Sequence, residues 1–253
     1  MSPLLESLAA REYGKRRRVH LLRHGSVSYF DASGRPLGTD LVPLNELGRV
    51  QAKAAGDLLK GVLFDRVIVS GLPRTIETAE LVLQHNHQAA PAYETWADLR
   101  EIRGARMQDL SEDEIESGFL DVFAQPSNFD TRFMGGETVR AFADRIWPAF
   151  ARLLADPSWK EALLVLHSGT NRAILSYCMA GGRDGKCGVF LGSLHQTPAC
   201  INLINIGDAA RSDFVVRAVN IAALDLLQTK SRKTTMEELL EKYLKFKRSK
   251  QGV

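Results

Sequence analysis

Short apolar runs alternate with amphipathic segments along the chain, and this order predicts strands followed by helices. Residues 19–23 form a compact run that ends in Arg-His-Gly, and runs of similar length cover 66–70 and 162–166. Strands that are apolar at nearly every position are buried on both faces, as in parallel sheets covered by helices. We therefore predict an α/β fold, a three-layer sandwich with a mostly parallel central sheet flanked by helices on both faces.

Helical signals follow these runs. Asn45 can cap a helix that Gly61 ends, and the apolar positions between them recur at helical spacing: Leu47, Val50, Ala54 and Leu58. Pro73 suits the first turn of a helix that runs to about residue 84. The segments 138–155 and 171–179 are expected to be helical as well.

The remaining pattern completes the domain. Segments 199–206 and 214–219 are close enough to pair as a hairpin. We find no repeat and no clear linker, so we expect one domain over 1–253, with an insertion at about 103–135 and a C-terminal helix at about 234–248. The apolar face of that helix fits the chain's own core or a second subunit equally well, which leaves a homodimer open.

Composition narrows the function classes. Of 253 residues, 45% are hydrophobic and 25% charged, with a formal net charge of +3, which predicts a folded protein and does not favour a nucleic-acid partner. Three widely spaced cysteines without a C-x-x-C pair suggest neither a disulfide framework nor a zinc site. No apolar run is long enough for a membrane span or a signal peptide, so we expect a cytoplasmic protein without a membrane partner.

Polar residues suited to phosphate binding follow three of the predicted strands. Arg23 and His24 end the first, Ser70 ends the second with Arg74 one turn later, and His167 ends the third. The carboxyl ends of parallel strands meet at one edge of the sheet, so these groups should converge. Guanidinium groups, imidazoles and a helix N-terminus together bind a dianion such as phosphate. With no carboxylate cage for a metal, we expect no metal and no cofactor, and a histidine is available as the nucleophile.

Four segments together carry a family resemblance. The sequence "VHLLRHGS" resembles the phosphate-binding signature of the histidine phosphatase superfamily, also called phosphoglycerate mutase-like. Three further segments are similar to the family's second arginine, acid and second histidine segments, in the family's order: "VSGLPRTIETAEL", "LREIRG" and "LLVLHSGTNRAIL". The segment "LNELGRVQA" resembles the family's first helix. The likeness spans roughly residues 19–180 and favours the phosphatase branch.

The resemblance implies a role for each matching residue. His24 would attack phosphorus and become a phosphohistidine, while Arg23, Arg74 and His167 would hold the phosphoryl oxygens. Glu101 would be the proton donor. Apart from these matching residues, we expect phosphate contacts from the hydroxyl of Ser26 or Ser28 and from Ser168, at a helix start with free backbone N–H groups. The implied enzyme is a metal-independent histidine acid-type phosphatase, a phosphoric monoester hydrolase acting on a small phosphorylated metabolite.

The chain departs from the family pattern just after the nucleophile. The family commonly has Glu-Thr or Glu-Ser after the glycine and an asparagine six residues past the histidine, whereas this chain has Ser26, Val27 and Phe30. Two alternatives stay open: a cofactor-dependent phosphoglycerate mutase, and a catalytically silent module that binds a phosphometabolite. Within the phosphatase interpretation, we hypothesise that a basic cluster beside the acid favours substrates with a second anionic group: Arg100, Arg103 and Arg106.

Overall fold

The computed structural model describes residues 16–35, 37–86, 91–105, 109–120, 122, 128–182, 192–207, 213–226 and 232–251. Its strands are β1 (Arg17–Arg23), β2 (Arg66–Val69), β3 (Glu94–Thr95), β4 (Glu161–Leu166), β5 (Ile201–Ile206) and β6 (Phe214–Ile221). Its helices are α2 (Glu46–Leu58), α3 (Pro73–Asn86), α4 (Glu112–Leu120), α5 (Val139–Ala155), α6 (Ser168–Met179) and α7 (Thr235–Gln251), with 3-10 turns η2 (Thr39–Leu41), η3 (Ala97–Leu99) and η5 (Phe133–Gly135).

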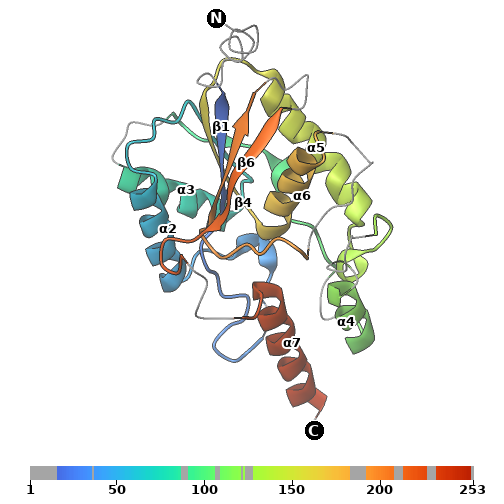
Figure 1. Cartoon of the computed structure of the whole chain (residues 1–253). Coiled ribbons are helices and arrows are strands. Elements are labelled where there is room, and N and C mark those ends of the chain that lie inside the picture. Colours follow the sequence, from blue (N-terminus) through green and yellow to red (C-terminus); the bar gives the residue numbers. More distant parts are fainter. Residues whose placement is uncertain are drawn as a thin grey trace, which may run out of the picture.

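The six strands form one sheet in the order β3-β2-β4-β1-β5-β6. Strands β3, β2, β4 and β1 run parallel to one another, and β5 is antiparallel to both of its neighbours, β1 and β6. Helices α2 and α3 lie on one side of the sheet and α5 and α6 on the other (Figure 1). The predicted three-layer α/β sandwich with a mostly parallel sheet is confirmed, as is the hairpin of β5 and β6.

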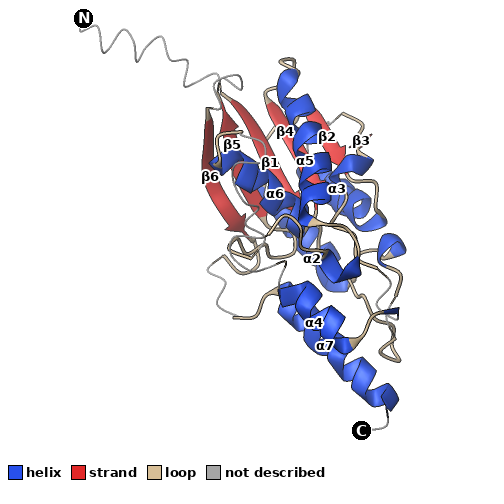
Figure 2. Cartoon of the chain, turned by 90° about the vertical axis from the view of Figure 1, so that its right-hand side faces the viewer, coloured by secondary structure: helices blue, strands red, loops and turns tan. Residues whose placement is uncertain are grey.

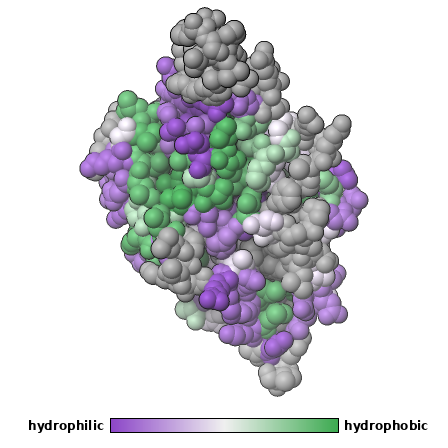
Figure 3. Space-filling model, viewed as in Figure 1, coloured by the Kyte–Doolittle hydropathy of each residue, from purple (hydrophilic) through white to green (hydrophobic). Residues whose placement is uncertain are grey.

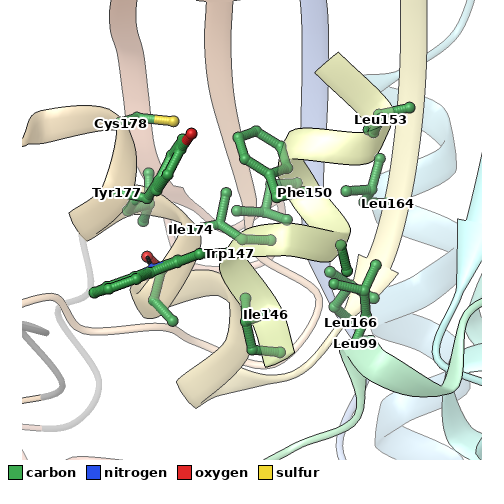
Figure 4. Close-up of a cluster of buried hydrophobic side chains, with 14 of the residues drawn as sticks. Leu99, Ile146, Trp147, Phe150, Leu153, Leu164, Leu166, Ile174, Tyr177 and Cys178 are labelled. Carbon is green, nitrogen blue, oxygen red and sulfur yellow. Dashed lines mark hydrogen bonds between the residues drawn. The ribbon is translucent and has the colours of Figure 1, made fainter. Parts of the chain in front are cut away.

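Alternate residues of the strands serve the two layers. Along β4, Leu164 and Leu166 pack with α5 and α6, while Leu163 and Val165 face α2 and α3. The layer beneath α5 and α6 holds large side chains such as Trp147, Phe150 and Tyr177 (Figure 4). Each fully buried side chain of this size contributes roughly 1.5–3 kcal/mol relative to exposure. This dense layer fixes the strand ends from which the polar residues project.

The buried side of helix α2 is not the side that carries its large apolar residues. Leu47, Val50 and Leu58 are 54%, 52% and 51% exposed. The buried residues are small: Gly48, Ala52, Ala55 and Gly56. A Cβ on Gly56 would lie 2.6 Å from the carbonyl oxygen of Val82 in α3. Close packing of the two helices therefore requires small residues and leaves the larger ones outside.

Helices α4 and α7 lie side by side beyond the carboxyl ends of the strands (Figure 2). Helix α7, expected at about 234–248, begins with a capping box in which Thr234 and Glu237 exchange hydrogen bonds. Tyr243 of α7 is 1% exposed and packs with Leu110, Ile115 and Met134, so the helix docks on its own chain.

The surface divides by polarity. Hydrophobic residues gather in the upper part of one face, around β6, and hydrophilic residues are frequent near α7 (Figure 3). Within the described part of the chain, no helix combines the length and apolar character needed to cross a membrane.

Candidate active site

Three neighbouring strands bring the predicted polar residues to one edge of the sheet. His24 directly follows β1, His167 follows β4, and Ser70 follows β2. The backbone N–H of His24 donates to the carbonyl of Leu166 at 2.9 Å, which ties the first two strand ends together. The two imidazole rings lie 5.2 Å apart, centroid to centroid, at 66°. Both histidines are buried, at 3% and 0% exposure.

The hydrogen bond of His24 determines which ring nitrogen carries the proton. Its Nδ1 lies 2.7 Å from the carbonyl oxygen of Gly25, which can only accept, so Nδ1 is the donor. Burial and the positive charges of Arg74 and Arg23 hold the pKa of His24 well below 6.5, and the ring is therefore neutral near pH 7. A neutral ring with its proton on Nδ1 has a lone pair on Nε2. A nitrogen with such a lone pair can act as a nucleophile.

His167 is held by a chain of hydroxyl groups. Thr75 donates its hydroxyl proton to the carbonyl of Leu72 at 2.8 Å, so at 3.1 Å it accepts from Ser70. Ser70 in turn accepts from Nε2 of His167 at 2.7 Å. Burial and the charge of Arg74 lower the pKa of His167 well below 6.5 as well, so this ring is neutral with its proton on Nε2.

Two buried arginines flank the histidines. Arg74, in the first turn of α3, is 3% exposed and donates to the carbonyl of Thr39 at 2.7 Å. Its Nε is buried and has no acceptor among the described residues. Arg23 is 5% exposed, and its Nη1 donates to the carbonyl of Gln196 and to the hydroxyl of Thr235 at 3.0 Å. Buried positive charge beside neutral imidazoles suits an anion.

Glu101 lies against the start of α6. Its Oε2 accepts from the backbone N–H of Gly169 at 2.8 Å, and its Oε1 from the N–H of Ile102 at 3.0 Å. A Cβ on Gly169 would lie 2.4 Å from Oε1 of Glu101. Because residue 169 has no side chain, the carboxyl group of Glu101 can contact the backbone there, two positions after His167 in the sequence.

The two predicted serines differ in their surroundings. Ser168, the first residue of α6, is 8% exposed and adjoins His167. The hydroxyl of Ser26 accepts from Asn45 at 3.2 Å, and its N–H donates to Gln51 at 2.8 Å. These bonds tie Ser26 to the N-cap residue of α2 and to a residue within that helix.

The basic cluster beside the acid is engaged by the protein. Nε of Arg100 donates to the carbonyl of Ser70 at 3.4 Å, and Arg103 lies 3.6 Å from a carboxylate oxygen of Glu137. Arg106 lies outside the described residues. Arg100 and Arg103 thus already interact with acceptors of the protein itself. A second anionic group of a substrate would have to share these two side chains with those acceptors.

Two residues near the site were not anticipated from the sequence. Thr235, which bonds Arg23, is 212 positions away along the chain, and no local pattern marks such a contact. Arg172, one turn into α6, is 3% exposed, and burial, with a contribution from the charge of Arg23, lowers its pKa to about 10. Its position five residues after His167, in the helix predicted to follow that histidine, could have indicated from the sequence that Arg172 lies near the site. In the part of the chain that the structure describes, no three His, Cys, Asp or Glu side chains are grouped to hold a metal ion.

Comparisons with known proteins identify the family of this chain. The family profile of the histidine phosphatase superfamily (branch 1) matches residues 19–221. A probable phosphoglycerate mutase, GpmB, of Salmonella paratyphi A is 30% identical over 153 residues, covering 59% of this chain and 68% of that protein. The 2-carboxy-D-arabinitol-1-phosphatase of Triticum aestivum is 29% identical over 208 residues, covering 75% of this chain and 40% of the relative. The crystal structure of the α-ribazole phosphatase of Shigella flexneri superimposes with a TM-score of 0.63 at 25% identity, covering 80% of this chain and 96% of that one.

Proposed function

This chain belongs to the histidine phosphatase superfamily, and we propose that it is a metal-independent phosphomonoester hydrolase that acts through a phosphohistidine at His24. The observation that carries the proposal is the hydrogen bond of the buried His24, whose Nδ1 donates to the carbonyl of Gly25 and so leaves the lone pair of Nε2 for attack on phosphorus. The buried guanidinium groups of Arg23 and Arg74 lie close enough to the ring for their charges to lower its pKa. Two of the similar proteins, from Triticum aestivum and Shigella flexneri, are named as phosphatases.

In the first step, Nε2 of His24 attacks phosphorus in line and the bond to the leaving oxygen breaks. Arg23 and Arg74 stabilise the negative charge on the equatorial oxygens. Glu101, entering the step protonated, gives its proton to the leaving oxygen, so that an alcohol departs.

In the second step, a water molecule attacks the phosphohistidine. Glu101, now a carboxylate, takes the proton of that water, the phosphorus–nitrogen bond breaks, and inorganic phosphate leaves. His24 returns to its neutral form, and its Nδ1–H remains bonded to Gly25 throughout.

The hydrogen bonds of His167 decide which of its ring nitrogens can bind a phosphoryl oxygen. Its Nε2–H is committed to Ser70, so a bond to a phosphoryl oxygen must come from Nδ1. That nitrogen carries a proton only when the ring is charged. Binding of a dianion therefore favours uptake of one proton at His167.

Hydrolysis of an aryl phosphate in excess chelator tests the proposal. The wild type and a variant of a histidine on α3, His85→Ala, should turn over, and His24→Ala should not. Turnover that persists in His24→Ala, or that the chelator abolishes, would exclude this mechanism.

Phosphoglycerate mutase activity is the second candidate, because the Salmonella relative carries that name. Interconversion of 2- and 3-phosphoglycerate, primed with the bisphosphate, would be measured beside hydrolysis. Mutase turnover that exceeds hydrolysis of every phosphomonoester tried would favour it. If neither reaction occurs but phosphate esters bind, the chain is a silent phosphometabolite-binding module.

A further inference from the structure

Arg145 on α5 uses all of its donors within the protein. Its Nε and Nη2 donate to the two carboxylate oxygens of Glu137, each at 2.8 Å. The remaining three N–H groups donate to backbone carbonyls: Asp98 at 2.7 Å, Arg100 at 2.6 Å and Glu101 at 2.8 Å. A guanidinium has five N–H groups, so none is left over.

These bonds hold a segment that has no helix or strand of its own. Residues 100–105 follow η3 as irregular backbone. Arg145 holds the carbonyl side of this segment, and Glu137 accepts from the N–H of Arg103 at 3.1 Å. The side chains of Arg145 and Glu137 are only 16% and 7% exposed, so solvent screens the pair weakly. The ion pair thus brackets Glu101 on both sides along the chain.

From this geometry we infer that Arg145, with Glu137, is the positioning residue for Glu101 as proton donor. The inference rests on the proposed function. Arg145 sets the backbone of residue 101, and the N–H of Gly169 sets its carboxyl group. Neither contact reaches His24, Arg23 or Arg74 through any hydrogen bond described above. The charge of Arg145 also contributes, after burial and the charges of Arg74, His24 and Arg23, to the low pKa of His167. Loss of Arg145 therefore weakens protonation of the leaving group first, while the hydrogen bonds of His24, Arg23 and Arg74 stay in place.

The chemistry requires arginine at this position. A lysine has a single ammonium with three donors and cannot bind both oxygens of Glu137 while it bonds three separate carbonyls. Methionine keeps the apolar stem and the packing against Phe142, whose ring lies 4.9 Å from the guanidinium carbon. Arg145→Met and Arg145→Lys are accordingly both expected to lose the clamp.

The dependence on the leaving group separates positioning from general damage. Phenyl phosphate releases a strongly basic oxygen that needs a proton, whereas 4-nitrophenyl phosphate releases a weakly basic one. For Arg145→Met, kcat/KM on phenyl phosphate should fall on the order of 100-fold, since general acid catalysis contributes that much or more, and on 4-nitrophenyl phosphate only a few-fold. Arg140→Met is the matched control, on the same helix but 56% exposed and paired with Asp130.

Each outcome is decisive. Equal losses on both substrates, or no loss, would overturn the positioning role, provided that the wild type shows His24-dependent turnover. If wild-type turnover does not depend on His24, the proposed function itself fails. If Arg145→Met does not fold, Arg145→Lys and Glu137→Gln carry the same expectation. In a Glu101→Gln background, Arg145→Met should add no further loss on phenyl phosphate, and an additive loss would contradict the inference.

Discussion

A single methyl group on Gly169 should displace the carboxyl group of Glu101. The Cβ of an alanine would lie 2.4 Å from Oε1, and ordinary van der Waals contact begins at about 3.4 Å, so one of the two must retreat by about 3.4 − 2.4 = 1 Å. Helix α6 is packed on the sheet and cannot shift easily. The carboxyl group is at the end of the flexible Glu101 side chain, so it is the group that moves. A misplacement of about 1 Å costs on the order of 100-fold in rate, or about 2.7 kcal/mol of activation free energy.

Stability should not fall with activity. Gly169 has no positive φ, and alanine is favoured over glycine inside a helix by about 1 kcal/mol. The strain is relieved by moving one side chain, so we expect the Tm of Gly169→Ala to be unchanged or higher. This separation distinguishes displacement of the acid from a folding defect.

The assay combines kcat/KM on phenyl phosphate, the Tm, and a double-mutant cycle with Glu101→Gln. Because Gly169→Ala acts through Glu101, the double variant should be no slower than Glu101→Gln alone. Wild-type activity in Gly169→Ala, or a loss that multiplies with that of Glu101→Gln, would refute the reasoning.

Three further predictions concern the phosphate pocket. The pKa values of His24 and His167 are well below 6.5 in the folded protein, so below about pH 6.5 the unfolded chain binds more protons than the folded one. The free energy of unfolding should therefore decrease as the pH is lowered from about 6.5, by up to about 2.7 kcal/mol per pH unit, and His167→Asn should halve that slope in urea titrations. Sulfate, which does not titrate near neutral pH, should bind with uptake of close to one proton by calorimetry in buffers of different ionisation enthalpy, and His167→Asn should abolish the uptake. Thr235→Val should weaken vanadate inhibition on the order of tenfold by removing one acceptor of Arg23, while the carbonyl of Gln196 remains, and Thr235→Ser should be near wild type. Equal inhibition of both variants would show that the bond to Thr235 does not orient Arg23.

The convergence of the site was predictable because it follows from topology alone. Once three apolar runs are strands of one parallel sheet, the residues that follow them must lie at one edge, and His24, Ser70 and His167 do. The helix over 46–58 was predictable for a similar reason, since periodicity survives whichever side faces inward. Which side that is depends on the close approach of α3, and hydrophobicity along one helix contains no information on it.

The supports of the site were not predictable in the same way. Arg145 contacts residues 44 to 47 positions away, and Thr235 contacts Arg23 across 212 positions. These bonds form only after α5 and α7 have packed. No local pattern in the sequence therefore marks the residues that make them. Glu101 itself was identified from a resemblance, while the clamp that holds it required the folded chain.

The departure from the family pattern at Phe30 and the C-terminal helix form one feature. Phe30, at the position where the family commonly has asparagine, packs against the cluster that contains Tyr243 of α7. The family profile ends at residue 221, so α7 lies beyond it. The loop after His24 thus has an apolar side chain packed on the cluster that holds Tyr243, in place of a polar one, and α7 in turn supplies the hydroxyl of Thr235 to Arg23. A substitution at Phe30 should therefore act on phosphate binding through the position of α7, and pairing it with Thr235→Val in a double-mutant cycle should show less than additive losses.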